Sequence, residues 1–171
     1  MIAVESVAWD DPAAVALRDA LRTEIRHRYA DRILRREGIA ADLAVAAEAV
    51  VYTGVAYAAV GDGSRVPVGH VALRRWGDGT TDVELKRMYV APTHRGRGVS
   101  KALLHAVEQA ATGLGAGRIV LQTGDRQPDA VRVYERDGYT RIPIFAPYEA
   151  LTYSHCFAKT VSFRESGTLS R

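Results

Sequence analysis

The sequence contains a single cysteine, Cys156, among its 171 residues. One cysteine excludes both a disulfide framework within the chain and a metal site built from several thiolates. The sequence also has no apolar run long enough to cross a bilayer, and its first residues lack the basic segment followed by an apolar stretch that is typical of a secretion signal. We therefore expect a cytoplasmic protein with no bound metal and no membrane partner, in which Cys156 is an inert, buried side chain.

A strong excess of one sign of charge is also missing. The chain has 23 lysines and arginines against 20 aspartates and glutamates, which gives a net charge of +3. This small surplus favours an anionic ligand. The basic residues are scattered, and no basic strand studded with aromatic residues accompanies them, so we expect no nucleic-acid partner.

Apolar residues, by contrast, are abundant at 47% of the chain, which is enough for one core in a protein of this length. No repeat or linker divides the sequence, and we expect one domain over residues 1–161 and a tail at 162–171. Hairpin-like segments followed by a helix–strand–helix run predict an α/β (α+β) fold, with a central mixed β-sheet of about six to seven strands flanked by helices. The predicted strands are residues 2–9, 50–60, 67–76, 81–90, 117–123, 139–145 and 151–161, and the predicted helices are residues 10–38, 99–111 and 128–138.

Two glycines, Gly96 and Gly98, stand directly before the helix predicted at 99–111. A helix N-terminus has unpaired backbone N–H groups and a partial positive charge. Glycines at that place allow an anionic group to approach the backbone closely. Arg95, Arg97 and Lys101 add formal charge around it. The stretch is therefore compatible with a phosphate site, although a short Gly-x-Gly motif taken alone favours an ordinary exposed turn.

The two familiar phosphate motifs do not match this stretch. A P-loop requires Gly-Lys-Ser/Thr, whereas Gly98 is followed by Val99, Ser100 and Lys101. The dinucleotide fingerprint requires a third glycine at the position of Lys101 and a preceding parallel strand. A phosphate site here would be of another kind.

The wider segment "ELKRMYVAPTHRGRGVSKALLHAVEQA" resembles the acyl-CoA-binding segment of the GNAT superfamily of N-acyltransferases. That family carries Arg/Gln-x-x-Gly-x-Gly/Ala after a strand that ends in an apolar-aromatic-Val-x-Pro run. Arg95, Gly98 and Ser100 occupy the three fixed positions, and Ser100 departs from the usual glycine or alanine. Further along, "AVRVYERDGYTRI" is similar to the family's short helix with a central tyrosine. The resemblance covers residues 50–161, and the first third of the chain matches only in outline.

The resemblance implies an N-acetyltransferase that transfers the acetyl group of acetyl-CoA to a primary amine of a small molecule or peptide. Attack would be direct, without an acyl-enzyme. A catalytically silent acyl-CoA-binding regulatory module on the same fold is the alternative, and the resemblance leaves a homodimer open. The implied coenzyme-binding residues are Met88, Tyr89, Val90, Arg95, Gly96, Arg97, Gly98, Val99, Ser100 and Lys101.

In this reading the backbone amides of residues 95–101 hold the pyrophosphate, and the main chain of Met88 and Val90 pairs with the pantetheine arm. The family's two central parallel strands separate at this point. The pair Lys86 and Arg87 interrupts the alternation of the strand, which is consistent with a β-bulge. Met88 and Val90 are also compatible with simple core packing.

Tyr134 stands at the tyrosine position of the family, and the resemblance implies that it protonates the departing thiolate. An ordinary packing tyrosine is the alternative. Glu84 aligns with a glutamate that is the general base in some members, but it could also be an exposed glutamate on an edge strand. His70 and water are the other candidate bases. An N–H near Tyr89 or Val90 would bind the oxyanion.

The sequence says least about the acceptor. In the family, the early helices and the loop before the last strand wall the acceptor pocket. The candidate acceptor residues are therefore Glu24, Arg28, Tyr29, Phe145 and Tyr148, together with His70. A solvated helix face is the simpler explanation of the charged segment that contains Arg28.

Overall fold

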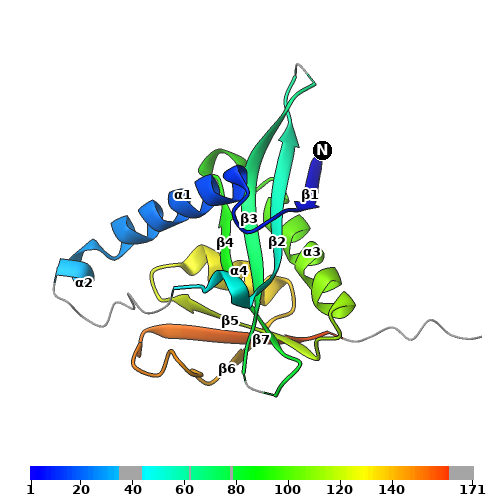
Figure 1. Cartoon of the computed structure of the whole chain (residues 1–171). Helices are drawn as coiled ribbons and strands as arrows, with labels where there is room; N and C mark the ends of the chain where they lie inside the picture. Colours follow the sequence, from blue (N-terminus) through cyan, green and yellow to red (C-terminus); the bar gives the residue numbers. More distant parts are fainter. Residues whose placement is uncertain (35–43, 62, 78, 162–171) are drawn as a thin grey trace, which may run out of the picture.

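The computed structural model describes residues 1–34, 44–61, 63–77 and 79–161. Within these ranges, seven strands form one mixed sheet in the order β1-β2-β3-β4-β5-β7-β6, with helices on both faces (Figure 1). The predicted fold class is confirmed, while the predicted tail at 162–171 lies outside the described residues. The strands are β1 (Ile2–Ser6), β2 (Val50–Ala59), β3 (Arg65–Arg75), β4 (Val83–Val90), β5 (Arg118–Gly124), β6 (Thr140–Ile142) and β7 (Ser154–Thr160), and the helices are α1 (Pro12–Arg28), α2 (Ala30–Leu34), α3 (Val99–Gly113) and α4 (Pro128–Arg136).

The sheet consists of two antiparallel parts joined by one parallel pair. β1 to β4 pair antiparallel with their neighbours, as do β5, β7 and β6. The parallel pair β4 and β5 is short, because only Val83–Leu85 and Ile119–Leu121 are in register. Beyond these residues the two strands diverge, and β5 and β7 run steeply across the direction of β2 to β4 (Figure 1). The strand separation implied by the family resemblance is thus present.

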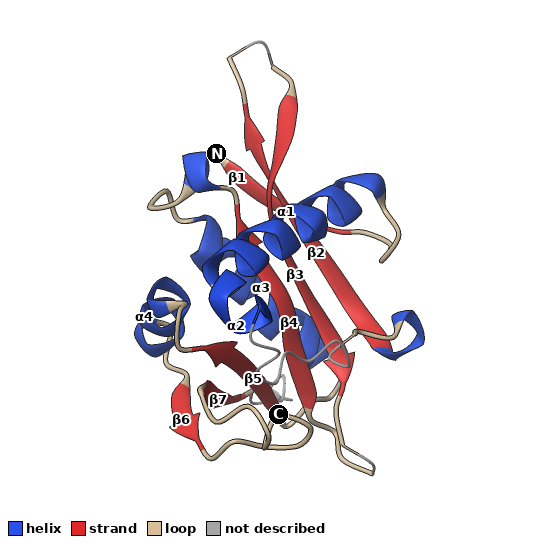
Figure 2. Ribbon diagram, turned by 90° about the vertical axis from the view of Figure 1, so that its left-hand side faces the viewer, coloured by secondary structure: helices blue, strands red, loops and turns tan. Residues whose placement is uncertain are grey.

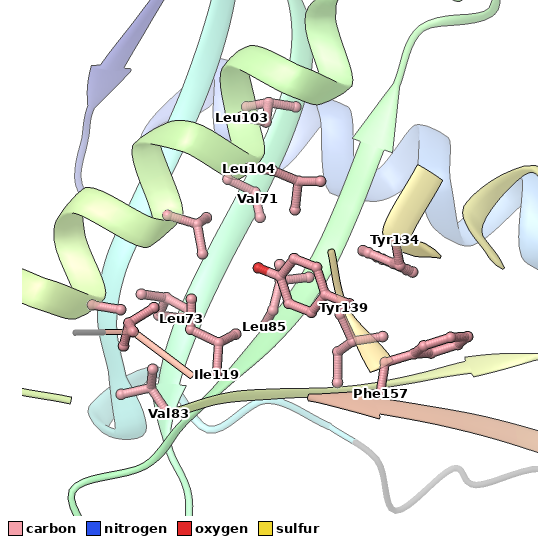
Figure 3. Packing of buried hydrophobic residues seen from close by; sticks show 14 of the residues in the cluster. Val71, Leu73, Val83, Leu85, Leu103, Leu104, Ile119, Tyr134, Tyr139 and Phe157 are labelled. Atoms are coloured by element: carbon pink, nitrogen blue, oxygen red, sulfur yellow. The ribbon is translucent and has the colours of Figure 1, made fainter. Parts of the chain in front are cut away.

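The two long helices cover opposite faces of the antiparallel part (Figures 1 and 2). Leu103 and Leu104 of α3 are buried with Val71 and Leu73 of β3 in the main core cluster (Figure 3). The helix predicted over 99–111 is thus present, and burial of each leucine contributes about 1.5–3 kcal/mol. On the other face a smaller cluster forms around Leu17 of α1.

The first helix is shorter than the sequence predicts. Its start is as expected, because the Asp11 carboxylate accepts hydrogen bonds from the N–H groups of Ala13 and Ala14. It ends at Arg28, and the chain turns at Tyr29 into the short α2. The predicted end near residue 38 lies outside the described residues.

A contact from the β5–α4 connection explains the turn. The guanidinium of Arg126 donates to the carbonyl of Arg28 at 3.0 Å, and the Arg126 N–H donates to the Tyr29 hydroxyl at 3.0 Å. These bonds satisfy the end of α1 from a segment that is distant in the sequence. Helical periodicity alone could not predict them.

Candidate functional site

A cavity of about 630 Å³ opens where β4 and β5 separate. Its walls are the C-terminal half of α1, the end of β4, the N-terminus of α3, and α4. The cavity therefore brings together the two segments that carry the sequence motifs. Of the predicted site residues, those that line it are Glu24, Arg28, Met88, Tyr89, Val90, Arg95, Gly96, Gly98, Val99, Ser100, Lys101 and Tyr134. Those outside its lining are Tyr29, His70, Glu84, Arg97, Phe145 and Tyr148.

The loop before α3 presents unpaired backbone N–H groups at this cavity. Gly96 and Gly98 have φ values of 74° and 82°, in the left-handed region that favours glycine. Gly98 is the N-cap of α3, and no side chain caps this helix. Within the described ranges, no hydrogen bond uses the N–H groups of residues 96–101. Together with the partial positive charge of the helix end, these unpaired amides are suited to bind an anion.

The loop is also open at the positions where side chains would project if Gly96 and Gly98 were replaced by larger residues. A Cβ built on Gly96 or Gly98 meets no atom of the described chain within 4 Å. Lys101 and Arg136 line the same cavity and add positive charge near it. The donor set and the open backbone thus fit a phosphate group.

Ion pairs join α1 to this loop across the cavity. The Glu24 carboxylate accepts one hydrogen bond from Arg95 and one from Arg28, each at 2.6 Å. Arg95 also donates through Nε to the carbonyl of Val90 at 3.0 Å. Glu24 therefore fixes the Arg95 guanidinium beside the anion site and ties the helix to the loop.

β4 contains a bulge just before the cavity. The pairing register shifts between His70 and Ala72 of β3, so that two residues of β4, Arg87 and Met88, stand opposite Val71. Such an extra residue is a β-bulge, and Arg87 has a positive φ of 57°. The irregularity predicted from the sequence at this point is confirmed.

The bulge changes which face of the sheet the later residues occupy. Val83 and Leu85 belong to the core cluster on the α3 face. Met88 and Val90 pack against that same cluster, while Tyr89 belongs to the cluster on the α1 face. Strict alternation would place Met88 and Val90 on the α1 face instead. The bulge is what brings them to the cavity.

Tyr134 of α4 supplies a phenol to the cavity wall. Its ring is held in the core by Tyr139 and Phe157, with ring centroids 5.7 Å and 6.0 Å away. Burial raises the pKa of the Tyr134 phenol, so the hydroxyl is protonated at neutral pH. Burial alone accounts for this shift, and no hydrogen bond to a group of the described chain contributes to it. A protonated, uncommitted hydroxyl in a cavity can donate a proton to a bound group.

Glu84 is fully buried, and it lies on a strand in the middle of the sheet. The alternative of an exposed glutamate on an edge strand is therefore wrong. Its carboxylate accepts a hydrogen bond from Nε of Arg74 at 2.6 Å and another from the Tyr148 hydroxyl, and Nζ of Lys86 lies 3.4 Å away. Burial lowers the pKa of Lys86 to about 8. Glu84 thus belongs to a buried charged network outside the cavity wall, and its role as a base stays a prediction.

His70 is fully buried on β3. Its Nδ1 lies 2.8 Å from the carbonyl oxygen of Arg87, and its Nε2 lies 3.2 Å from Nη1 of Arg18. Burial lowers the pKa of His70 to about 4, so the ring is neutral at pH 7. Both ring nitrogens contact groups of the chain, which leaves neither directed at the cavity.

The remaining predicted acceptor residues have structural partners. Tyr29 packs at the turn after α1, and Tyr148 is committed to the Glu84 network. The Phe145 ring lies edge-on to Tyr148, with ring centroids 5.3 Å apart. Burial raises the pKa of the Cys156 thiol, in line with the predicted inert side chain.

Sequence reasoning missed part of the α1 wall. Leu21 and Ile25 line the cavity together with Glu24 and Arg28. The four residues have the spacing i, i+3, i+4 and i+7, which places them on one helix face. That spacing was the available signal, and it places Glu24 and Arg28 on the helix face that lines the cavity.

The described residues also bear on two other features, a metal centre and a membrane-spanning helix. Among them, no cluster of three or more histidine, cysteine, aspartate or glutamate residues could hold a metal ion. In the same ranges, no helix is long and apolar enough to span a bilayer.

Comparison with known proteins agrees with the geometry of the cavity. A Klebsiella pneumoniae protein assigned to the acyl-CoA N-acyltransferases is similar in structure, with a TM-score of 0.72, 26% identity, and coverage of 95% of this chain and 99% of that one. The IAA acetyltransferase of Azospirillum brasilense is 35% identical over 65 residues, which are 38% of this chain and 42% of the relative. An uncharacterised N-acetyltransferase of Mycobacterium tuberculosis is 36% identical over 72 residues, 42% of this chain and 45% of the relative.

These two curated relatives match over less than half of their own length. The family model of the acetyltransferase (GNAT) family, in contrast, matches residues 20–139, which include α1 from Ala20 onward, the bulged strand, the loop before α3, and α4. Membership implies an acyl-CoA co-substrate and an acceptor. The chain belongs to the GNAT family of acetyltransferases.

Proposed function

We propose that this protein transfers an acetyl group from acetyl-CoA to a primary amine of a small molecule or peptide, by direct attack of the amine. The observation that carries the proposal is the single cavity that contains both the unpaired amides of residues 96–101 and the Tyr134 hydroxyl. The amides suit the phosphates of coenzyme A, and the hydroxyl suits the sulfur atom that leaves as a thiolate. Acetyl-CoA would supply the activated acetyl group as a thioester.

The loop before α3 would bind the pyrophosphate. Its amides offer several N–H donors without a competing partner, and Lys101 and Arg136 add charge. Ser100 stands where the family usually has glycine or alanine, and its small side chain at the cavity wall still allows close approach. Charge-assisted hydrogen bonds of this kind are the strong ones.

The end of β4 would bind the pantetheine arm. Past Leu85, β4 has no ladder with β5, so the backbone of Met88 and Val90 on that side can pair with an extended ligand as with an added strand. An N–H near Tyr89 or Val90 would stabilise the oxyanion of the tetrahedral intermediate.

Tyr134 would then protonate the departing thiolate. Its phenol is held in place by the core rings and is protonated at neutral pH because burial raises its pKa. As the group that accepts the proton of the amine we propose Glu84. This carboxylate lies outside the cavity wall, so the proton must reach it through a relay. Tyr148, Lys86 and water are the groups that could form it.

The acceptor would enter beside α1. Glu24 offers a carboxylate at the cavity for a cationic amine, and Leu21 and Ile25 offer apolar surface next to it. Ion pairing with Arg28 and Arg95 keeps that carboxylate in place before a substrate arrives.

A thiol-release assay tests the proposal. Acetyl-CoA is incubated with the protein and with a panel of amino acids, polyamines, aminoglycosides and peptides, and free CoA is measured against a control without protein. We expect amine-dependent release with an equal amount of acetylated amine. Binding of acetyl-CoA without turnover on any amine would favour the silent acyl-CoA-binding module instead.

A further inference from the structure

The bulge in β4 needs support, because Arg87 adopts a left-handed backbone conformation at φ 57°. L-residues with a side chain rarely adopt this region, and such a conformation persists only where the surrounding structure holds it. The bulge is also what turns Met88 and Val90 toward the cavity. The group that holds the backbone of Arg87 therefore influences the coenzyme site.

His70 is the side chain that contacts this backbone from the neighbouring strand. Its Nδ1 lies 2.8 Å from the carbonyl oxygen of Arg87, and its Nε2 lies 3.2 Å from Nη1 of Arg18. A guanidinium can only donate hydrogen bonds, so Nε2 must be the acceptor. In a neutral imidazole the proton is then on Nδ1, which donates to the carbonyl of Arg87.

Arg18 is itself fixed by Trp9. The guanidinium lies 3.6 Å from the centre of the Trp9 ring, and Nη2 donates to the Trp9 carbonyl at 2.7 Å. The Trp9 ring also lies edge-on to His70, with ring centroids 6.1 Å apart. The segment before α1 and the helix itself thus set the tautomer of a histidine on β3.

We propose that His70 is a positioning residue: by donating from Nδ1 to the carbonyl of Arg87, it holds the β4 bulge that presents Met88 and Val90 to acyl-CoA. This inference rests on the proposed function, because it concerns the pantetheine part of the coenzyme site. It also replaces the role of His70 as a base. The low pKa of the buried ring and the engagement of Nε2 by Arg18 agree with a neutral donor that does not take up substrate protons.

Binding of two ligands distinguishes a positioning role of His70 from general damage to the fold. Coenzyme A has both the phosphates and the pantetheine arm, whereas adenosine 3′,5′-bisphosphate lacks the arm. Isothermal titration calorimetry on the full chain measures the affinity of both. We expect His70→Phe to weaken binding of CoA about tenfold or more, because a buried carbonyl loses its donor, while the affinity for the bisphosphate stays within about twofold.

His70→Asn is the rescue variant, because its side-chain amide can donate from nearly the position of Nδ1. His70→Gln places its amide nearer the position of Nε2 and serves as the matched control. CoA should bind more tightly to His70→Asn than to His70→Gln. Equal CoA affinity in these two variants, undiminished affinity in His70→Phe, or equal weakening of both ligands would each overturn the proposal.

A spectroscopic reading of the wild type is independent of how the variants fold. The side-chain nitrogen spectrum of His70 should show the proton on Nδ1 across neutral pH, and a proton on Nε2 would overturn the proposal. If the wild-type protein binds the bisphosphate and CoA equally weakly or not at all, the proposed function fails, and the tautomer reading still tests the contact with Arg87.

Discussion

Tyr134 and Tyr139 are neighbouring buried tyrosines, and they differ in their access to the cavity. Tyr134 lines it, whereas the hydroxyl of Tyr139 is buried without a hydrogen-bond partner in the described chain. We predict that Tyr134→Phe keeps its affinity for CoA but lowers acetyl transfer by roughly 10²–10⁴-fold, the usual contribution of a general acid or base. Steady-state kinetics and calorimetry measure the two effects.

Tyr139→Phe is the matched control for this substitution. It removes a buried hydroxyl that lies outside the cavity lining and makes no hydrogen bond in the described chain, so kcat should change little. Wild-type turnover in Tyr134→Phe would show that water or another group protonates the thiolate. An equal loss in both variants would show that the effect comes from core packing.

The buried imidazole of His70 predicts a pH dependence of stability. Its pKa is about 4 in the folded protein, against a usual value of 6.5. Between these values the unfolded chain binds a proton that the folded chain does not, so the free energy of unfolding must fall as the pH drops from about 6.5 to about 4. Denaturant unfolding at a series of pH values should show this slope in the wild type and a smaller slope in His70→Asn. Identical slopes in the two proteins would contradict the assigned environment.

Glu84 and Asp82 allow a comparison of a buried and a partly exposed ion pair. Glu84 is 0% exposed and balances Arg74 and Lys86, whereas Asp82 pairs with Arg118, whose side chain is 43% exposed. Glu84→Gln leaves the buried Lys86 and the partly buried Arg74 with less compensation, and we predict a loss of about 3–5 kcal/mol in the free energy of unfolding. Asp82→Asn should cost about 1 kcal/mol or less.

Glu84→Gln also tests whether Glu84 is the general base of the reaction. If Glu84 accepts the amine proton through a relay, Glu84→Gln should lose rate most at low pH, where the neutral amine is scarcest. Rates must be measured at a temperature at which the variant is folded. An equal loss of rate at every pH would assign Glu84 a structural role alone.

At the scale of elements, substitutions at the two ends of α3 distinguish an effect on CoA binding from an effect on stability. Gly98 before the helix and Gly115 after it both have a positive φ, and an added Cβ at either place meets no atom of the described chain within 4 Å. A side chain in this conformation costs about 1–2 kcal/mol. We predict that Gly98→Val and Gly115→Val lose similar stability, while only Gly98→Val loses most of its affinity for CoA. Thermal unfolding and calorimetry test this, and equal CoA affinity in both variants would contradict a backbone phosphate site.

The elements that local patterns define were predictable. The apolar spacing of 99–111 predicted α3, and the charged pair before Met88 indicated the bulge, because both signals lie within one element. The break of the first helix at Tyr29 was not predictable, since it depends on hydrogen bonds from Arg126. The position of Met88 and Val90 on the α3 face of the sheet was not predictable either, because it depends on the bulged pairing of β4 with β3.

At the scale of the whole molecule, the site depends on α1 lying over the gap between β4 and β5. Glu24 reaches Arg95 from a segment that is far away in the sequence. The place of the loop before α3 at the cavity was predictable because its motif residues are contiguous, and that of Tyr134 because its segment has a motif of its own. The pairing of Glu84 with Arg74 and the cavity-facing stripe of α1 needed the three-dimensional arrangement.

The most direct test of the account is a crystal structure of the protein with bound CoA. The account predicts that the pyrophosphate lies within hydrogen-bonding distance of the N–H groups of residues 96–101, and that the sulfur lies within reach of the Tyr134 hydroxyl. A pyrophosphate bound away from this loop, or a sulfur on the Glu84 side of the sheet, would contradict it.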